Sequence, residues 1–354
     1  MQENNTVYYD NLSVSSSPHL VTSLDTSKTM LYVLMAMVPA CIASVVFFGA
    51  RALVLIIACM LASVVFELGY EKLMKKENTV RDLSACVTGM ILALNMPANF
   101  PIWMAVIGCF VAIVIVKMLY GGIGRNIANP AIVGRIVLLL SFTTQMTTWP
   151  LTTFQKAGVD AVTGATPLGL LADGAFNETP SLMQMFIGNI GGAMGETCTI
   201  AILLGCAFLI YKKIISPIIP CVFIGTVFVF ALCYYTFAGG EASALHMALF
   251  HVLSGGVCFG AVFCATDYVT SPIMKEAKVI YAIGCGLVTM IIRLFCAYPE
   301  GVSFAILFMN VLTPLIDGMV VNRVYGITQR EKEAKKKAKE EAKKGSEEKK
   351  EVAA

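Results

Sequence analysis

Hydrophobic residues in this chain occur in long runs rather than in short amphipathic patterns. A helix needs roughly 20 mostly apolar residues to cross the hydrocarbon core of a bilayer. Ten runs reach or approach that length, and the third and fifth are the shortest. They cover residues 29–48, 52–70, 84–94, 102–119, 128–142, 196–211, 218–237, 245–265, 279–297 and 302–321. The pattern predicts an all-α polytopic membrane protein with about ten transmembrane helices.

Polar segments divide the chain into five parts. They are an N-terminal segment (1–27), a first five-helix repeat (28–142), a long loop (143–195), a second five-helix repeat (196–325) and a charged tail (326–354). Because five is odd, two such halves have opposite orientations, as in many transporters. The third run begins "LSACVTG" at Leu83, and "LSGGVCFG" begins at Leu253 in the eighth. We therefore expect a 5+5 inverted repeat; the alternative is chance similarity between two closely packed helices of small residues.

Lysine and arginine are distributed unequally between the two sides of the predicted bundle. One side holds Lys28, Lys72, Lys75, Lys76, Arg81, Lys117, Arg125, Lys212, Lys213, Lys275, Lys278 and Arg323 with the tail. The other side holds Arg51, Lys156 and Arg293. Cytoplasmic loops carry the excess of positive charge. Both termini are therefore predicted to be cytoplasmic, and the loop 143–195 is predicted to lie outside.

Composition supports the membrane class and excludes several functions. Hydrophobic residues make up 57% of the 354 residues and charged residues 14%, against about 45–50% and about 25% in soluble domains. The net charge of +3 and the lack of a basic groove argue against nucleic acid. Twelve cysteines show no metal-ligand spacing, His246 and His251 are five residues apart, and no ATP or NAD motif is present. The Lys/Glu/Ala-rich tail is typical of a solvated segment, with docking to a partner as the alternative.

Five charged residues fall within or beside the apolar runs: Glu67, Arg135, Glu196, Arg293 and Asp317. Placement near the membrane interfaces explains most of them, with Arg135 reaching the cytoplasmic surface and Arg293 the outside. The alternative for the whole group is an ion path through the bilayer, and Asp317 and Asp267, just past the eighth run, are the candidates singled out for it.

The segment "YGGIGRNIANPAIVGR", residues 120–135, contains a predicted helix start. Asn129 followed by Pro130 is a good N-cap followed by a proline in the first turn. The three glycines before it allow positive φ and close backbone approach. This local explanation leaves Arg125 and Asn126 unused, and side-chain amides suit the imide edge of a flavin. Arg125, Asn126 and Asn129 are therefore candidates for binding a non-covalent flavin.

The string "DAVTGATPL", residues 160–168, lies in the predicted outer loop and fits the pattern Asp-x-x-Ser/Thr-Gly-Ala-Ser/Thr. It resembles the site at which a flavin transferase joins FMN to a threonine through the phosphate. Together with "GRNIANPAIVGR" and "ATDYVTSP", it makes residues 28–325 similar to the D subunits of Rnf electron-transport complexes. The B subunit of the sodium-pumping NADH:quinone oxidoreductase is a close relative.

The resemblance implies that Thr166 carries FMN through a phosphoester bond. Asp160, Thr163, Gly164 and Ala165 would then form the recognition motif for the transferase. The local alternative is that Thr166 only caps a helix beginning at Pro167. The two roles can coexist, because a helix N-terminus also stabilises a phosphate.

The function implied by the resemblance is that of a membrane flavoprotein within a larger complex. Such complexes couple electron transfer between ferredoxin and NAD to translocation of sodium ions or protons. The subunit would not be catalytic alone. Its cofactors would be covalent FMN and a non-covalent riboflavin. Its partners would be the other Rnf subunits, the flavin transferase and the lipids of a bacterial or archaeal cell membrane. The alternatives are the B-type subunit of the quinone-reducing relative and a redox-silent 5+5 transporter or channel.

Overall fold

The computed structural model describes residues 25–76, 78–156, 163–238, 243–296 and 300–320. Within these ranges the chain is helical, and its one extended pairing is an isolated antiparallel bridge between Pro150 and Thr163. The first-half helices are α1 (Thr26–Phe48), α2 (Ala50–Met74), η1 (Val80–Asp82), α3 (Ser84–Leu94), α4 (Ile102–Phe110), η2 (Val111–Met118) and α5 (Pro130–Ser141). The second-half helices are α10 (Thr199–Tyr211), α11 (Ile218–Ala238), α12 (Ala244–Leu253), α13 (Val257–Phe259), η4 (Gly260–Cys264), α14 (Lys275–Phe295) and α15 (Val302–Met319).

Several of these helices are long and apolar enough to span a bilayer. In the described ranges they are Thr26–Phe48, Ala50–Met74, Ile218–Phe237, Lys275–Phe295 and Val302–Met319, with the bent pair Ala244–Leu253 and Val257–Cys264 as a sixth candidate. Shorter apolar helices cover Ser84–Leu94, Ile102–Met118, Pro130–Ser141 and Thr199–Tyr211. The prediction of an all-α membrane protein is confirmed, and a helix lies at each of the ten predicted runs.

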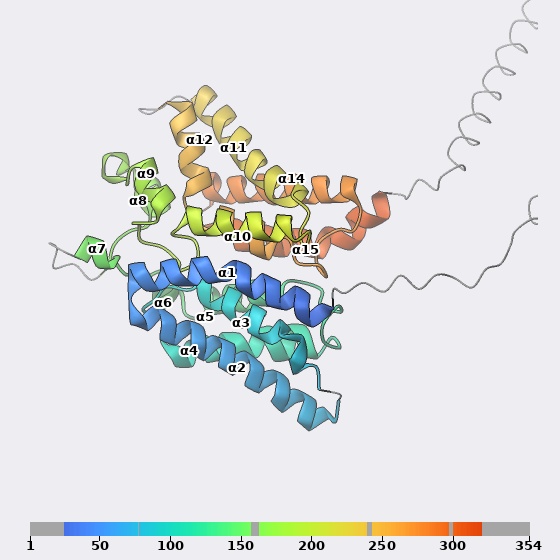
Figure 1. Cartoon of the computed structure of the whole chain (residues 1–354). Helices are drawn as coiled ribbons and strands as arrows, with labels where there is room; N and C mark the ends of the chain where they lie inside the picture. The colour runs from blue at the N-terminus through green and yellow to red at the C-terminus, as the bar shows by residue number, and fades with distance from the viewer. Residues whose placement is uncertain (1–24, 77, 157–162, 239–242, 297–299, 321–354) are drawn as a thin grey trace, which may run out of the picture.

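The helices form two groups that meet along α1 and α10 (Figure 1). One group contains α2 to α5, and the other contains α11 to α15. Small side chains allow the close contact between the groups: a Cβ on Gly205 of α10 would lie 2.3 Å from the carbonyl oxygen of Ala36 on α1. The largest apolar cluster contains side chains from both groups, so the halves pack against each other.

The eighth run, predicted as one helix over 245–265, is broken in the structure. The helix α12 ends at Leu253, and α13 begins at Val257 after a bend of 59°. Gly255 between them has φ +63°, which glycine adopts without strain. The π-helical segment η4 continues α13, and η2 likewise ends the α4 span. The short α13–η4 segment resembles the short helix α3. Each comes after a residue in the left-handed region, which is Gly255 for α13 and Leu83, with φ +60°, for α3.

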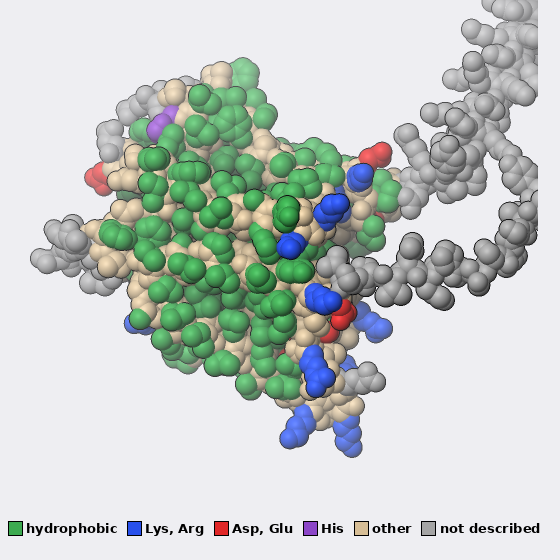
Figure 2. Space-filling view, in the orientation of Figure 1, with side chains coloured by type: hydrophobic (Ala, Val, Ile, Leu, Met, Phe, Trp, Pro, Cys, Tyr) green, Lys and Arg blue, Asp and Glu red, His purple; other side chains and the backbone are tan. Residues whose placement is uncertain are grey.

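The predicted outer loop contains short helices rather than an open chain. They are α6 (Thr143–Met146), α7 (Thr153–Lys156), α8 (Pro167–Ala172), η3 (Phe176–Glu178) and α9 (Leu182–Ile187). Figure 1 places α7, α8 and α9 at one end of the molecule. Leu168 of α8 and Met185 of α9 share a small apolar cluster with Phe250 of α12. Figure 2 shows most of the visible Lys and Arg side chains at the opposite end.

Candidate functional site

A cavity of about 640 Å³ opens between the two groups of helices. Its walls come from α1, α3, η2, the 123–130 segment, the end of α10, η4 and the 266–269 segment. Asn126, Asn129 and Asp267, predicted from separate motifs, all line it. The structure thus brings two of the three flavin candidates and one ion-path candidate to one cavity. Its volume lies in the range of about 300–1,000 Å³ that is usual for small-molecule sites.

Asn129 has the capping role that the sequence predicts, and it has a second role. Its Oδ1 accepts hydrogen bonds from the backbone N–H groups of Ala131, at 3.0 Å, and Ile132, at 3.4 Å. Its Nδ2 donates to the carbonyl oxygen of Cys264 at 3.0 Å. Asn129 therefore joins the start of α5 to the end of η4, which belongs to the other half of the chain. This long-range bond holds the cavity walls together.

The glycine-rich turn before Asn126 behaves as predicted, but Arg125 does not face the cavity. Gly121, Gly122 and Gly124 all have positive φ. The Arg125 side chain is exposed and folds back beside Gly121, where a Cβ would lie 2.8 Å from its Cδ. Arg125 is absent from the described lining of the cavity. Among the flavin candidates, Asn126 and Asn129 remain.

Asp267 and Asp317 both hold the segment that follows η4. Asp267 accepts a hydrogen bond from Thr270 Oγ1 at 3.0 Å, and burial raises the pKa of its carboxyl group. Asp317 Oδ2 accepts the Ile273 N–H at 3.4 Å, while its Oδ1 is buried without a partner in the described residues. Only Asp267 of the two lines the cavity. An ion-path role for either remains a prediction.

The predicted attachment motif is part exposed and part buried. Asp160 lies outside the described residues. Thr163 and Ala165 are exposed, whereas Thr166 is only 8% exposed. A Cβ on Gly164 would lie 2.7 Å from Leu151 Cδ2, so a larger residue at this position would require the Leu151 side chain to move.

Thr166 is the N-cap of α8, as the local alternative predicts. Its Oγ1 accepts the Gly169 N–H at 3.0 Å, and Pro167 follows it in the first turn. Among the described residues the Thr166 hydroxyl accepts this bond and donates none, so its proton can be replaced by phosphorus without loss of a hydrogen bond. The hydroxyl therefore fits a phosphoester, although a transferase has to expose it first.

Two of the five charged residues at membrane depth, Arg135 and Glu67, form ion pairs inside the protein. Arg135 is 5% exposed and forms an ion pair with Glu300 as well as a hydrogen bond with Ser303. The prediction that Arg135 reaches the cytoplasmic surface is therefore wrong. Glu67 is fully buried and pairs with Lys117 at 2.8 Å. Buried charges require such partners because desolvation is costly.

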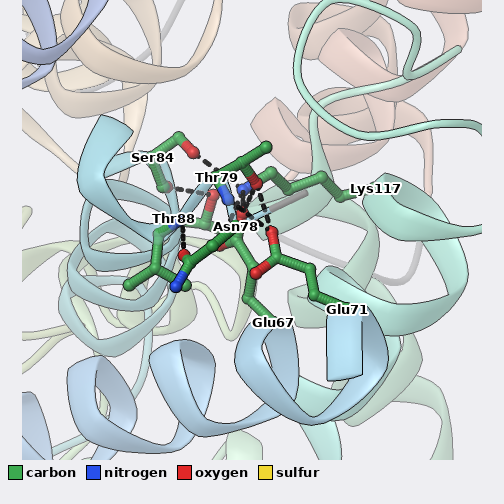
Figure 3. A network of polar contacts seen from close by, with 8 residues as sticks. Glu67, Glu71, Asn78, Thr79, Ser84, Thr88 and Lys117 are labelled. Atoms are coloured by element: carbon green, nitrogen blue, oxygen red, sulfur yellow. Dashed lines mark hydrogen bonds and ion pairs between the residues drawn. The ribbon is translucent and has the colours of Figure 1, made fainter. Parts of the chain in front are cut away.

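A polar network around Lys117 joins α2, α3 and η2 beside the cavity (Figure 3). Lys117 Nζ donates to both carboxylate oxygens of Glu67, at 2.8 and 2.9 Å, and to Ser84 Oγ at 2.7 Å. Thr79 donates its backbone N–H to Glu71 at 2.9 Å, and its hydroxyl lies within hydrogen-bond distance of both Glu67 and Glu71. Lys117 and Ser84 also line the cavity.

Sequence reasoning does not find this network. From sequence, Lys117 has only an orientation role, and Glu67 is assigned to the membrane interface or, with four other charged residues, to an ion path. One signal is available: Glu67 and Glu71 are four residues apart, so they share one face of α2. Their partners come from later parts of the chain, which this spacing does not identify.

Comparison with known proteins places the chain in a well-populated group of membrane proteins. The family model described as "NQR2, RnfD, RnfE family" matches residues 13–326. The chain is 46% identical over 330 residues to the D subunit of the Na(+)-translocating ferredoxin:NAD(+) oxidoreductase complex of Acetobacterium woodii, covering 92% of this chain and 98% of the relative. It is 42% identical to the proton-translocating counterpart of Clostridium ljungdahlii, covering 86% and 93%. It is 34% identical to the D subunit of the ion-translocating oxidoreductase complex of Escherichia coli O127:H6, covering 88% and 98%.

Proposed function

Because the chain belongs to the NQR2, RnfD, RnfE family, we propose that it is the D-type membrane subunit of an Rnf complex. The complex couples electron transfer between ferredoxin and NAD to translocation of sodium ions or protons. Similarity to named D subunits along nearly the whole chain carries this proposal. The subunit acts with other Rnf subunits and is not catalytic alone. Deleting it should abolish ferredoxin-driven ion uptake by membrane vesicles, and uptake that persists would contradict the proposal.

The chain's role within the complex is to bind and space flavins, which supply the electron-transfer chemistry. FMN is attached at Thr166, in the short-helix region that we place outside the membrane. The motif and the unused proton of the Thr166 hydroxyl support this site. In that arrangement Gly164 allows the motif to lie against Leu151, and the exposed Thr163 and Ala165 give the transferase access.

Substitution of the two hydroxyls tests the attachment. Thr166→Val keeps the side-chain shape and removes the oxygen, so the chain from cells that express the transferase should lose its fluorescence under ultraviolet light on a denaturing gel. Thr163→Val should lower the fluorescence without abolishing it. Full fluorescence of Thr166→Val, or complete loss only in Thr163→Val, would move the bond away from Thr166.

Riboflavin is the second proposed cofactor, and the cavity beside Asn126 is its site. The cavity has the volume for a tricyclic ring, and the Asn126 amide can donate to or accept from its imide edge. Asn126→Leu should therefore lower the extractable flavin of the purified complex while the covalent flavin stays. Asn126 is the better test residue because Asn129 also caps α5. Arg125→Leu is the matched control, because Arg125 is the neighbour of Asn126 in the chain and does not line the cavity.

We further propose ten spans in a 5+5 inverted repeat, with both termini cytoplasmic. The likeness of α3 and α13–η4 supports the repeat, and the gathering of basic side chains at one end supports the orientation (Figure 2). Single cysteines that replace Lys156 and Lys212 test it. An impermeant reagent added outside intact cells should label the first and not the second; the reverse result would invert the topology.

A further inference from the structure

The two glutamates of the Lys117 network carry more negative charge than the described residues around them balance. Glu67 is fully buried and Glu71 is 3% exposed. Lys117 is the single cation that pairs with them in the described chain, and its contacts go to Glu67. A second buried carboxylate without a counter-charge costs several kcal/mol. Glu71 therefore needs a further positive charge or a proton.

The hydrogen bonds at Thr79 lead to the same requirement. The Thr79 hydroxyl has one proton, yet its oxygen lies 3.0 Å from Glu67 Oε1 and still closer to Glu71 Oε1. It can donate to only one of them. The other contact is between two acceptor oxygens unless Glu71 holds a proton or a cation lies beside it. Figure 3 shows both carboxylates converging on Thr79.

The second oxygen of Glu71 supplies an independent observation. Glu71 Oε2 is buried, and no donor among the described residues reaches it. Buried carboxylate oxygens normally have a partner. This atom is available either to carry a proton or to coordinate a cation.

We propose that Glu71, with Thr79 and Glu67, forms a binding site for one monovalent cation, a proton or Na⁺. The site lies at the lysine-rich end of the protein, and Lys117 separates it from the cavity. Because Lys117 contacts both the Glu67 carboxylate and the cavity, a change of charge in the cavity alters the electrostatic energy of a cation at Glu71. The part of this site in ion translocation rests on the function proposed above.

The other titratable and charged groups on the surrounding elements are few. Cys86 of α3 interacts electrostatically with Glu67 and Lys117. The remaining charged residues on η1 and around the end of α2 are Arg81, Asp82, Lys72, Lys75 and Lys76. Substitution of Glu71 alone leaves all of these groups in place, so a carboxyl signal that disappears with it belongs to the site.

Infrared difference spectra of the purified whole complex test the proposal. In low-sodium buffer, the wild type should show the carbonyl band of a protonated carboxyl group, and Glu71→Gln should lose it. Loss of the wild-type band when Na⁺ is added identifies Na⁺ as a competing occupant. A wild-type band that persists after Na⁺ is added identifies the proton as the occupant of the site. The exposed Glu276 at the start of α14 provides the control: Glu276→Gln should keep the band.

Thr79→Val provides a second measurement that leaves both carboxyl groups in place. It should shift the band, because the hydroxyl partner of Glu71 is gone, and Thr79→Ser should restore it. Identical wild-type and Glu71→Gln spectra, both with and without Na⁺, would overturn the proposal. Ferredoxin-dependent NAD reduction by the same wild-type sample is measured in parallel. If the sample shows the carboxyl band but does not reduce NAD, the result counts against the proposed function and not against the cation site.

Discussion

The beginnings of the two short helices, α3 and α13–η4, are built alike but are stabilised differently. Leu83, directly before α3, and Gly255, two residues before α13, are both in the left-handed region, and each helix start has a basic side chain from a neighbouring helix beside it. At α3 this is Lys117, which contacts Ser84 and Glu67. At α13 it is Arg293, which donates to the carbonyl oxygens of His251, at 2.6 Å, and Ser254, at 2.9 Å.

The difference lies in the acidic partner. Glu67 accepts two hydrogen bonds directly from Lys117, whereas no hydrogen bond or ion pair joins Glu196 to Arg293 among the described residues. Glu196 Oε1 accepts the Ala193 N–H at 2.9 Å, and its Oε2 is buried without a partner in the described chain. Arg293 Nε is also buried and unpartnered there. One site is therefore a closed ion pair, and the other is an open polar cluster with two buried atoms that have no partner among the described residues.

The two sites should differ most in stability when the basic side chain of each, Lys117 or Arg293, is replaced by methionine. Lys117→Met leaves Glu67 buried beside Glu71 with no counter-charge and should cost about 3–5 kcal/mol. Arg293→Met leaves two carbonyl groups without a donor and should cost about 1–3 kcal/mol. Thermal unfolding of the solubilised complex measures both. The double variant Lys117→Met/Glu67→Met should recover much of the loss; no recovery would mean that the pair does not act as a unit.

Substitution of the acidic residues Glu67 and Glu196 should give a smaller difference in stability between the two sites. Glu67→Gln removes the charge that Lys117 pairs with, so it should destabilise the complex by about 3 kcal/mol or more. Glu196→Gln removes a charge whose second oxygen has no partner, so its cost should stay near or below about 1 kcal/mol. The unfolding midpoints of the two variants, measured at the same pH, test whether Glu67→Gln costs more stability than Glu196→Gln. Equal losses would contradict the distinction between a closed and an open site.

Substitutions at the two left-handed residues, Gly255 and Leu83, should have the smallest effects on stability, and these effects should have opposite signs. Gly255→Ala places a Cβ 2.8 Å from Arg293 Nη2 and 2.9 Å from Leu168 Cδ1 and forces a non-glycine residue to a positive φ, which costs about 1–2 kcal/mol. Leu83→Gly relieves the corresponding strain at the other site. Its gain should be reduced by the loss of the Leu83 side chain. Unfolding midpoints should therefore fall for the first variant and change little or rise for the second; a fall of equal size in both would show that φ is not the relevant variable.

Local features of the candidate site were predictable, and its assembly was not. Asn129 and Pro130 form a helix start from neighbouring residues alone, and the glycines before them reach positive φ for the same reason. The break in the eighth run was missed because apolar length continues across Gly255. Arg135 was misplaced because its partner, Glu300, is 165 residues away along the chain.

The amino-acid sequence by itself determined that this is an all-helical membrane protein, because uninterrupted apolar length and the need to pair every backbone group leave no other element for a bilayer. It also determined where helices start at local caps, as at Asn129 and Thr166. Only the tertiary structure decided how the two halves meet, which charges pair, and that Asn126, Asp267 and Lys117 share a cavity. The physical reason is range: caps and hydropathy act within a few residues, whereas ion pairs and cavities join segments that packing alone brings together.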